Sequence, residues 1–216
     1  MRKNLAPKLG YWSSLTVLIL GCFYFIIFVI YAFTSGDFRS EPIPFVQLSS
    51  GICTFLTVPV LVLLFTAIRY VNDGENKILG SLGVSFILLF AVTVSINRFV
   101  QLTVIQQNLP DLPYDLMRFT PYGEGSVMFA LEILGWGFFS SMAAAFVAPL
   151  FSSSPLNRAI RWLFIVYAIL SFNSFISSVT NITIPTGPIA WGPVMVVLSI
   201  LLSKYFRIKL RQEFKD

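Results

Sequence analysis

Six long apolar stretches, separated by short polar segments, constrain the fold of this chain more than any other feature. A run of about 18 or more apolar residues with few charges is typical of a helix that crosses a membrane. Inside the hydrocarbon layer every backbone polar group needs an internal partner, which a helix provides. We therefore predict an all-α bundle of six transmembrane helices, at residues 11–34, 45–71, 78–108, 127–151, 158–180 and 189–205.

The composition agrees with a membrane protein. Of the 216 residues, 56% are hydrophobic and 12% are charged, whereas a soluble domain carries about a quarter charged residues. The predicted helices occupy most of the chain and leave no room for a separate soluble domain. We expect one transmembrane domain over residues 1–216, with membrane lipids as its surroundings.

The distribution of positive charge predicts the orientation. Six crossings place both termini on one side of the membrane. Twelve cations lie on that side: Arg2, Lys3, Lys8, Arg69, Lys77, Arg158, Arg161, Lys204, Arg207, Lys209, Arg211 and Lys215. Only Arg39 and Arg118 lie on the other side. Because Lys and Arg are enriched in cytoplasmic segments, we predict cytoplasmic termini and interpret the net charge of +5 as an orientation signal, with no nucleic-acid partner.

Aromatic residues near the helix ends predict where the membrane surfaces lie. Trp and Tyr are enriched at the two interfaces between lipid and water. Tyr11, Trp12 and Trp162 would anchor the side that holds the termini, and Trp191 the opposite side.

The residue types present exclude several kinds of function. The chain has no histidine, which excludes a haem held by histidine and the His-ligated zinc sites of membrane hydrolases. Its two cysteines, Cys22 and Cys53, lack the CxxC spacing of a redox or metal site. No lysine lies in the middle of a predicted helix, which excludes the retinal linkage of a microbial rhodopsin. We expect neither a metal nor a cofactor.

Two charged residues lie well inside predicted helices and away from their ends, Arg98 in 78–108 and Glu132 in 127–151. At 1.5 Å per residue, Arg98 lies about 15 Å and Glu132 about 8 Å from the outer end of its helix. The first of these helices is longer than the hydrocarbon layer of ~30 Å, so the two depths converge. An unpaired charge at this depth costs on the order of a few kcal/mol. We therefore predict an ion pair, which either fixes two helices or lines a site.

Other polar side chains gather at the same level. Most inner halves of the helices are nearly pure Leu, Ile, Val, Phe and Ala, whereas the outer halves contain Asn, Gln, Ser and Thr. This asymmetry predicts a pocket that opens outward. The candidate ligand-binding residues are Arg98, Glu132, Asn97, Gln101, Asn173 and Ser177.

Three functions are compatible with these residues. The first hypothesis is binding or transport of a small or lipophilic molecule. Transport should leave either a cavity that passes the midplane or two related halves. The second is a membrane enzyme that acts on a lipophilic substrate, with Glu132 free of Arg98 as general acid or base. The third is an accessory or immunity-type membrane subunit with a filled interior. Glu132 is the sole candidate catalytic residue, and the balance is against an enzyme.

Two further patterns concern helix packing. Gly137, Ser141 and Ala145 are spaced by four residues, which allows close helix approach either within the bundle or at a dimer face. The segment ITIPTGPIAWGP (182–193) predicts a broken or delayed start of the last helix, as a simple turn or a mobile gate.

The segments RFVQLTV (98–104) and LEILGWGFFS (131–140) resemble small polytopic membrane proteins of bacteria and archaea that carry no assigned function. The resemblance covers the middle of the chain. It implies the plasma membrane of a prokaryote and no particular chemistry.

Overall fold

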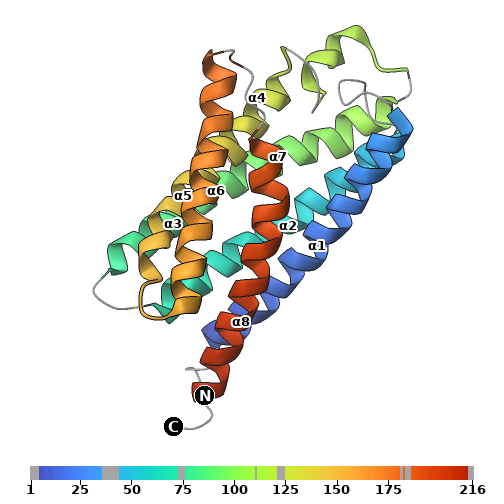
Figure 1. The fold of residues 1–216 in the computed structure, drawn as a ribbon. Helices are drawn as coiled ribbons and strands as arrows, with labels where there is room; N and C mark the ends of the chain where they lie inside the picture. The colour runs from blue at the N-terminus through green and yellow to red at the C-terminus, as the bar shows by residue number, and fades with distance from the viewer. Residues whose placement is uncertain are drawn as a thin grey trace.

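The apolar stretches form long helices in a computed structural model that describes residues 5–35, 44–72, 76–109, 111–120, 125–180, 182 and 186–213 (Figure 1). Within these residues, six helical segments are long and apolar enough to cross a membrane. The predicted fold class, an all-α membrane bundle, is confirmed.

The six spans differ in how regular their helices are. The first, second and fifth are single α-helices, α1 (Leu5–Ser35), α2 (Pro44–Val71) and α6 (Pro155–Thr180). The third consists of α3 (Lys77–Val100), η1 (Gln101–Ile105) and η2 (Gln106–Asn108). The fourth consists of α4 (Val127–Ile133), η4 (Leu134–Phe139), α5 (Ser140–Val147) and η5 (Ala148–Leu150). The sixth consists of α7 (Gly187–Ile189), η6 (Ala190–Val194) and α8 (Met195–Glu213). A short 3₁₀ segment, η3 (Tyr114–Phe119), lies between the third and fourth spans.

The last helix differs most from the sequence prediction. It was predicted to end at Tyr205, where the apolar residues end, but α8 continues to Glu213. Lys, Arg, Gln and Leu are good helix formers, so a basic segment after a span can remain helical. At the other end, helix begins at Gly187 and passes through Pro193 within η6, a π-helical segment. The broken or delayed helix start that the sequence predicted within 182–193 therefore corresponds to a helix that begins at Gly187 and contains a π turn at η6.

Glycines mark where neighbouring helices approach most closely. A Cβ atom built on Gly10 would lie 2.2 Å from the ring of Phe206, and one on Gly21 would lie 3.5 Å from Val196. Helix α1 therefore runs antiparallel to the last helix. The described ends of the chain, Leu5 and Glu213, consequently lie at the same end of the bundle (Figure 1). We call this the terminal end and the opposite one the loop end.

The fourth span packs internally through its small residues. A Cβ on Gly137 would lie 2.9 Å from the Cβ of Phe175 and 3.2 Å from its backbone nitrogen in α6. Ser141 is fully buried, whereas Ala145 is exposed. Gly137 and Ser141 therefore serve packing within the bundle.

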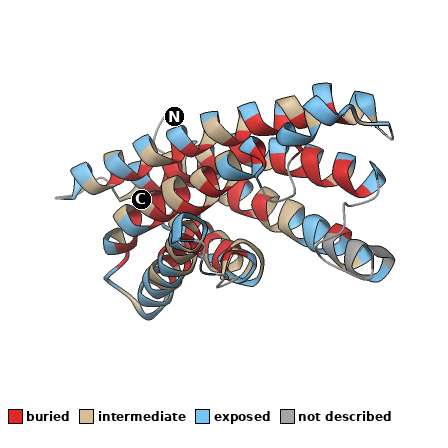
Figure 2. Ribbon diagram, turned by 90° about the horizontal axis from the view of Figure 1, so that it is seen from above, coloured by how far each residue is buried: buried red, intermediate tan, exposed pale blue. Residues whose placement is uncertain are grey.

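Apolar side chains fill the terminal half of the bundle. Phe90, Phe151, Phe206, Ile68 and Ile160 are completely buried. Figure 2 shows the buried residues on the sides of helices that face one another and the exposed residues on the outer sides. Many large apolar side chains are exposed on those outer sides, as expected where lipid replaces water.

Candidate functional site

Arg98 and Glu132 form the predicted ion pair. The Nη2 of Arg98 donates to the Oε1 of Glu132, and the two side chains are 5% and 12% exposed. The Nδ2 of Asn97 donates to the second carboxylate oxygen, Oε2. Both oxygens of Glu132 are therefore engaged, and the pair joins the third span to the fourth.

Gln101 extends this network to a third helix. The Nη1 of Arg98 donates to the Oε1 of Gln101 at 2.6 Å, and the Nε2 of Gln101 donates to the backbone carbonyl of Gln47 at 3.0 Å. Asn97, Arg98 and Gln101 are 0%, 4% and 1% exposed, so the network is sealed inside the bundle. We call Gln47, Asn97, Arg98, Gln101 and Glu132 the polar layer.

Local backbone geometry places the polar layer. Gln101 is the first residue of η1, and Glu132 lies two residues before η4; both segments are π-helical. A π turn holds an extra residue, which rotates the side chains after it relative to those before it, and such turns are frequent at functional sites. Gly51 of α2 leaves room for the side chain of Gln101. A Cβ on Gly51 would lie 3.3 Å from the Oε1 of Gln101, which is a tight contact.

An aromatic layer lies on the terminal side of the polar layer. The ring centroids of Phe90 and Trp136 are 4.7 Å apart, and those of Trp136 and Trp191 are 5.9 Å apart. The Nε1 of Trp191 donates to the Oγ of Ser171 at 3.1 Å. Trp191 is thus half-buried within the bundle, and its predicted role as an outer interface anchor is wrong.

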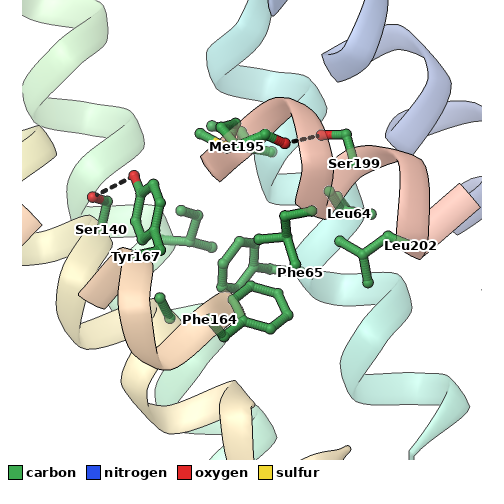
Figure 3. A pocket seen from close by; sticks show the side chains of 12 residues that line it. Leu64, Phe65, Ser140, Phe164, Tyr167, Met195, Ser199 and Leu202 are labelled. Atoms are coloured by element: carbon green, nitrogen blue, oxygen red, sulfur yellow. Dashed lines mark hydrogen bonds between the residues drawn. The ribbon is translucent and has the colours of Figure 1, made fainter. Parts of the chain in front are cut away.

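Beyond the aromatic layer lies a small cavity (Figure 3). Its volume is about 20 Å³, room for roughly one water molecule. The lining is mainly apolar, with Leu64, Phe65 and Phe164 among its residues. Its polar feature is a hydrogen bond of 2.9 Å between the hydroxyls of Ser140 and Tyr167. No residue of the polar layer lines this cavity.

The two remaining candidate residues contact a different part of the chain. The Nδ2 of Asn173 donates to the Oγ1 of Thr186 at 3.1 Å, and the hydroxyl of Ser177 donates to the carbonyl of Ile182. Both side chains therefore fasten the connection between α6 and α7. The structure brings together four of the six candidates, which are Asn97, Arg98, Gln101 and Glu132. The other two lie elsewhere, because shared depth does not ensure that two side chains face one another.

Two features of the site go beyond the predicted residues. The Gln47 carbonyl belongs to the network through its backbone, which a side-chain pattern does not reveal. The aromatic layer joins three spans through Phe90, Trp136 and Trp191. The Gly135–Gly137 pair was no signal for this layer, because a Cβ on Gly137 would meet Phe175 and one on Gly135 would lie nearest Val94.

Neither a protein-family model, nor a curated protein, nor a solved structure matches this chain. The fold and the site themselves define its class. It is a multi-pass α-helical membrane protein with a buried charge pair in the half of the bundle away from its termini.

Proposed function

We propose that this chain is a plasma-membrane protein of a prokaryote that binds a small or lipophilic molecule at the polar layer. The observation that carries the proposal is a charge pair buried with two amide side chains at one level of a membrane bundle. Ionisable residues within membrane spans are rare, and they commonly line the paths or sites of substrates and ions. Stability alone does not require such a pair, since apolar residues of similar volume often replace one without loss.

The contacts of the polar layer favour a ligand that carries both a hydrogen-bond acceptor and a donor. An anionic or carbonyl group would compete with Glu132 for the guanidinium of Arg98. Asn97 is fully buried, and its Oδ1 has no hydrogen-bond partner among the described residues. Buried polar atoms are normally paired, so a donor on the ligand would satisfy this oxygen.

The surroundings favour binding over passage. The aromatic layer closes the terminal side of the polar layer, and the described cavity beyond it has room for roughly one water molecule. A ligand would therefore enter from the loop end or from the lipid. Catalysis by Glu132 is disfavoured because both its oxygens already accept hydrogen bonds.

An accessory membrane subunit is the second candidate function. The terminal half is filled with side chains, and the charges of Arg98 and Glu132 pair with each other. Both features favour a subunit, because a protein that acts through its surface needs no cavity. The two candidate functions differ in whether substitutions in the polar layer should abolish the binding of a ligand.

The test compares wild type with the double variant Arg98→Met/Glu132→Leu, which removes both charges and keeps similar volumes. Organic extracts of the purified proteins are analysed by mass spectrometry for co-purified amphiphiles, beside thermal unfolding in detergent. We expect a folded double variant that lacks a molecule retained by wild type. The variant Asn173→Leu, outside the polar layer, should retain it. Identical extracts from all three proteins would favour the subunit.

We also propose that both termini face the cytoplasm, which the Lys and Arg distribution supports. Reporter fusions after Asp216 and within residues 109–126 should report opposite sides of the membrane. Fusions that report the same side would contradict the six crossings.

A further inference from the structure

The helical extension of α8 carries an exposed face that changes from apolar to basic along its length. Toward the loop end this face presents Val197, which is 46% exposed. Toward Glu213 it presents Lys204, Arg207 and Arg211, all exposed. These cations are spaced by three and four residues, which places them on one side of an α-helix. We call Lys204, Arg207 and Arg211, with the exposed Ile208 between them, the basic stripe.

The basic stripe lies where the last helix leaves the hydrocarbon layer. The segment Gly187–Gln212 has 26 residues, so it is about 39 Å long against a layer of ~30 Å. The hydroxyl of Tyr205 donates to the Oδ1 of Asn72 at 3.0 Å, just after the end of α2. Residues beyond Tyr205 therefore extend past the end of a neighbouring span, into the headgroup region.

Exposed tryptophans mark the same level. Trp12 is 65% exposed and lies two residues from Gly10, which packs against Phe206 of α8. Trp162, near the start of α6, is 64% exposed. Because tryptophans concentrate at the headgroup level, the basic stripe lies where lipid phosphates lie.

Among the described residues, no ion pair or ring contact involves a cation of the basic stripe. Tyr205 and Phe206, on the opposite side of the helix, are 3% and 0% exposed and hold α8 in the bundle. The ion pair in the described part of the chain joins Arg98 to Glu132, and it lies in the other half of the bundle. Lys209, next to the stripe, lies instead over the ring of Tyr205 at 5.8 Å.

We infer that the basic stripe binds the phosphate headgroup of an anionic membrane lipid, with an acyl chain along the apolar part of the same face. Clustered cations directly after a span attract anionic headgroups. The apolar continuation toward Val197 favours a lipid over a free phosphate, because only a lipid would occupy both parts of the face. This site is separate from the polar layer and does not depend on the function proposed for it.

The test uses the full chain in nanodiscs that contain phosphatidylglycerol and phosphatidylcholine, with native mass spectrometry of the lipids retained. The stripe variant is Lys204→Gln/Arg207→Gln/Arg211→Gln. The matched control, Arg69→Gln/Arg158→Gln/Arg161→Gln, removes the same charge from the same end on other helices. Each cation that contacts the bound headgroup should change binding by roughly fivefold. We expect phosphatidylglycerol to bind the stripe variant at least about tenfold more weakly, and the control within about twofold of wild type.

Three results would overturn the inference: equal weakening in both variants, which indicates diffuse attraction; no weakening in the stripe variant; or displacement of the lipid by millimolar inorganic phosphate. Thermal unfolding in phosphatidylcholine alone checks that the variants fold. Should the triple variant fail to fold, the single variant Arg207→Gln carries the test. Its expected loss is about fivefold, and unchanged binding there would equally overturn the inference.

Discussion

The two halves of the bundle differ in how the interior between their helices is filled. In the terminal half, aromatic and aliphatic side chains such as Phe151, Phe164 and Phe206 fill the space between helices, and no π-helical segment lies there among the described residues. In the loop half, the interior contains a charge pair, and three spans contain π-helical segments, η1, η4 and η6. Since the terminal half shows that this chain can pack a bundle mainly with apolar residues and without a buried charge pair, the polar layer is an addition that packing does not require.

The irregular backbone and the buried charge occur together in the loop half. Each feature carries an energetic cost that a simple bundle would avoid, and π turns frequently occur at functional sites. The comparison therefore assigns stability mainly to the terminal half and ligand recognition to the loop half.

Removing one charge of the polar layer should have the largest effect. In Glu132→Leu the guanidinium of Arg98 stays buried without its carboxylate, which typically costs about 3–5 kcal/mol. The free energy of unfolding, measured in mixed detergent micelles, should fall by that amount. A loss below about 1 kcal/mol would mean that Arg98 reaches the headgroups on its own.

A smaller loss is expected at the closest helix contact of the terminal half. In Gly10→Ala the new methyl group would lie 2.2 Å from the ring of Phe206, which is completely buried and has little room to move. Overpacking of this kind typically costs about 1–3 kcal/mol. Equilibrium unfolding in detergent measures it.

Gly21→Ala is the matched control for that substitution on the same helix. Its new Cβ would lie 3.5 Å from Val196, an ordinary contact. Ala also favours helix over Gly by about 1 kcal/mol, so this variant should be as stable as wild type or more stable. Equal destabilisation by both substitutions would show that α1 and α8 pack equally tightly in both halves.

The double variant Arg98→Met/Glu132→Leu should nearly restore the stability that Glu132→Leu loses. With both charges removed, no buried ion remains, and its unfolding free energy should lie within about 1 kcal/mol of wild type. A double-mutant cycle with both single variants measures the coupling. Additive losses would mean that the two side chains contribute independently, which would contradict their ion pair.

Hydropathy was sufficient to predict the six helices, because a membrane span is defined by length and apolar content. The ion pair was also predictable, since Arg98 and Glu132 lie at similar depth on consecutive spans and neither charge is stable alone. The contacts of Asn173 and Ser177 could not be predicted from depth. Their depth placed them with the polar layer, but their side chains contact the connection after α6.

The rotation of each helix about its own axis could not be predicted. A π turn adds a residue to a turn and redirects every side chain after it, yet it has no clear sequence signature. Trp191 is the clearest example, because its ring turns inward from η6 to meet Trp136. The helical continuation of α8 was missed for a different reason, since hydropathy reports the end of the span and not the end of the helix.

The smallest predicted effect of breaking a single contact concerns the hydrogen bond beside the small cavity of Figure 3. Tyr167→Phe removes the hydroxyl that meets Ser140 at 2.9 Å and keeps the ring, which is 4% exposed, in place. Hydrogen bonds between membrane helices contribute about 0.6 kcal/mol on average, so the unfolding free energy should fall by roughly that amount. Ser140→Ala removes the same hydrogen bond and should lose a similar amount, since the second bond of its hydroxyl, to the Trp136 carbonyl, lies within its own helix. A loss above about 2 kcal/mol in Tyr167→Phe would mean that this contact organises the terminal half as strongly as apolar packing does, and the division of roles between the halves would then fail.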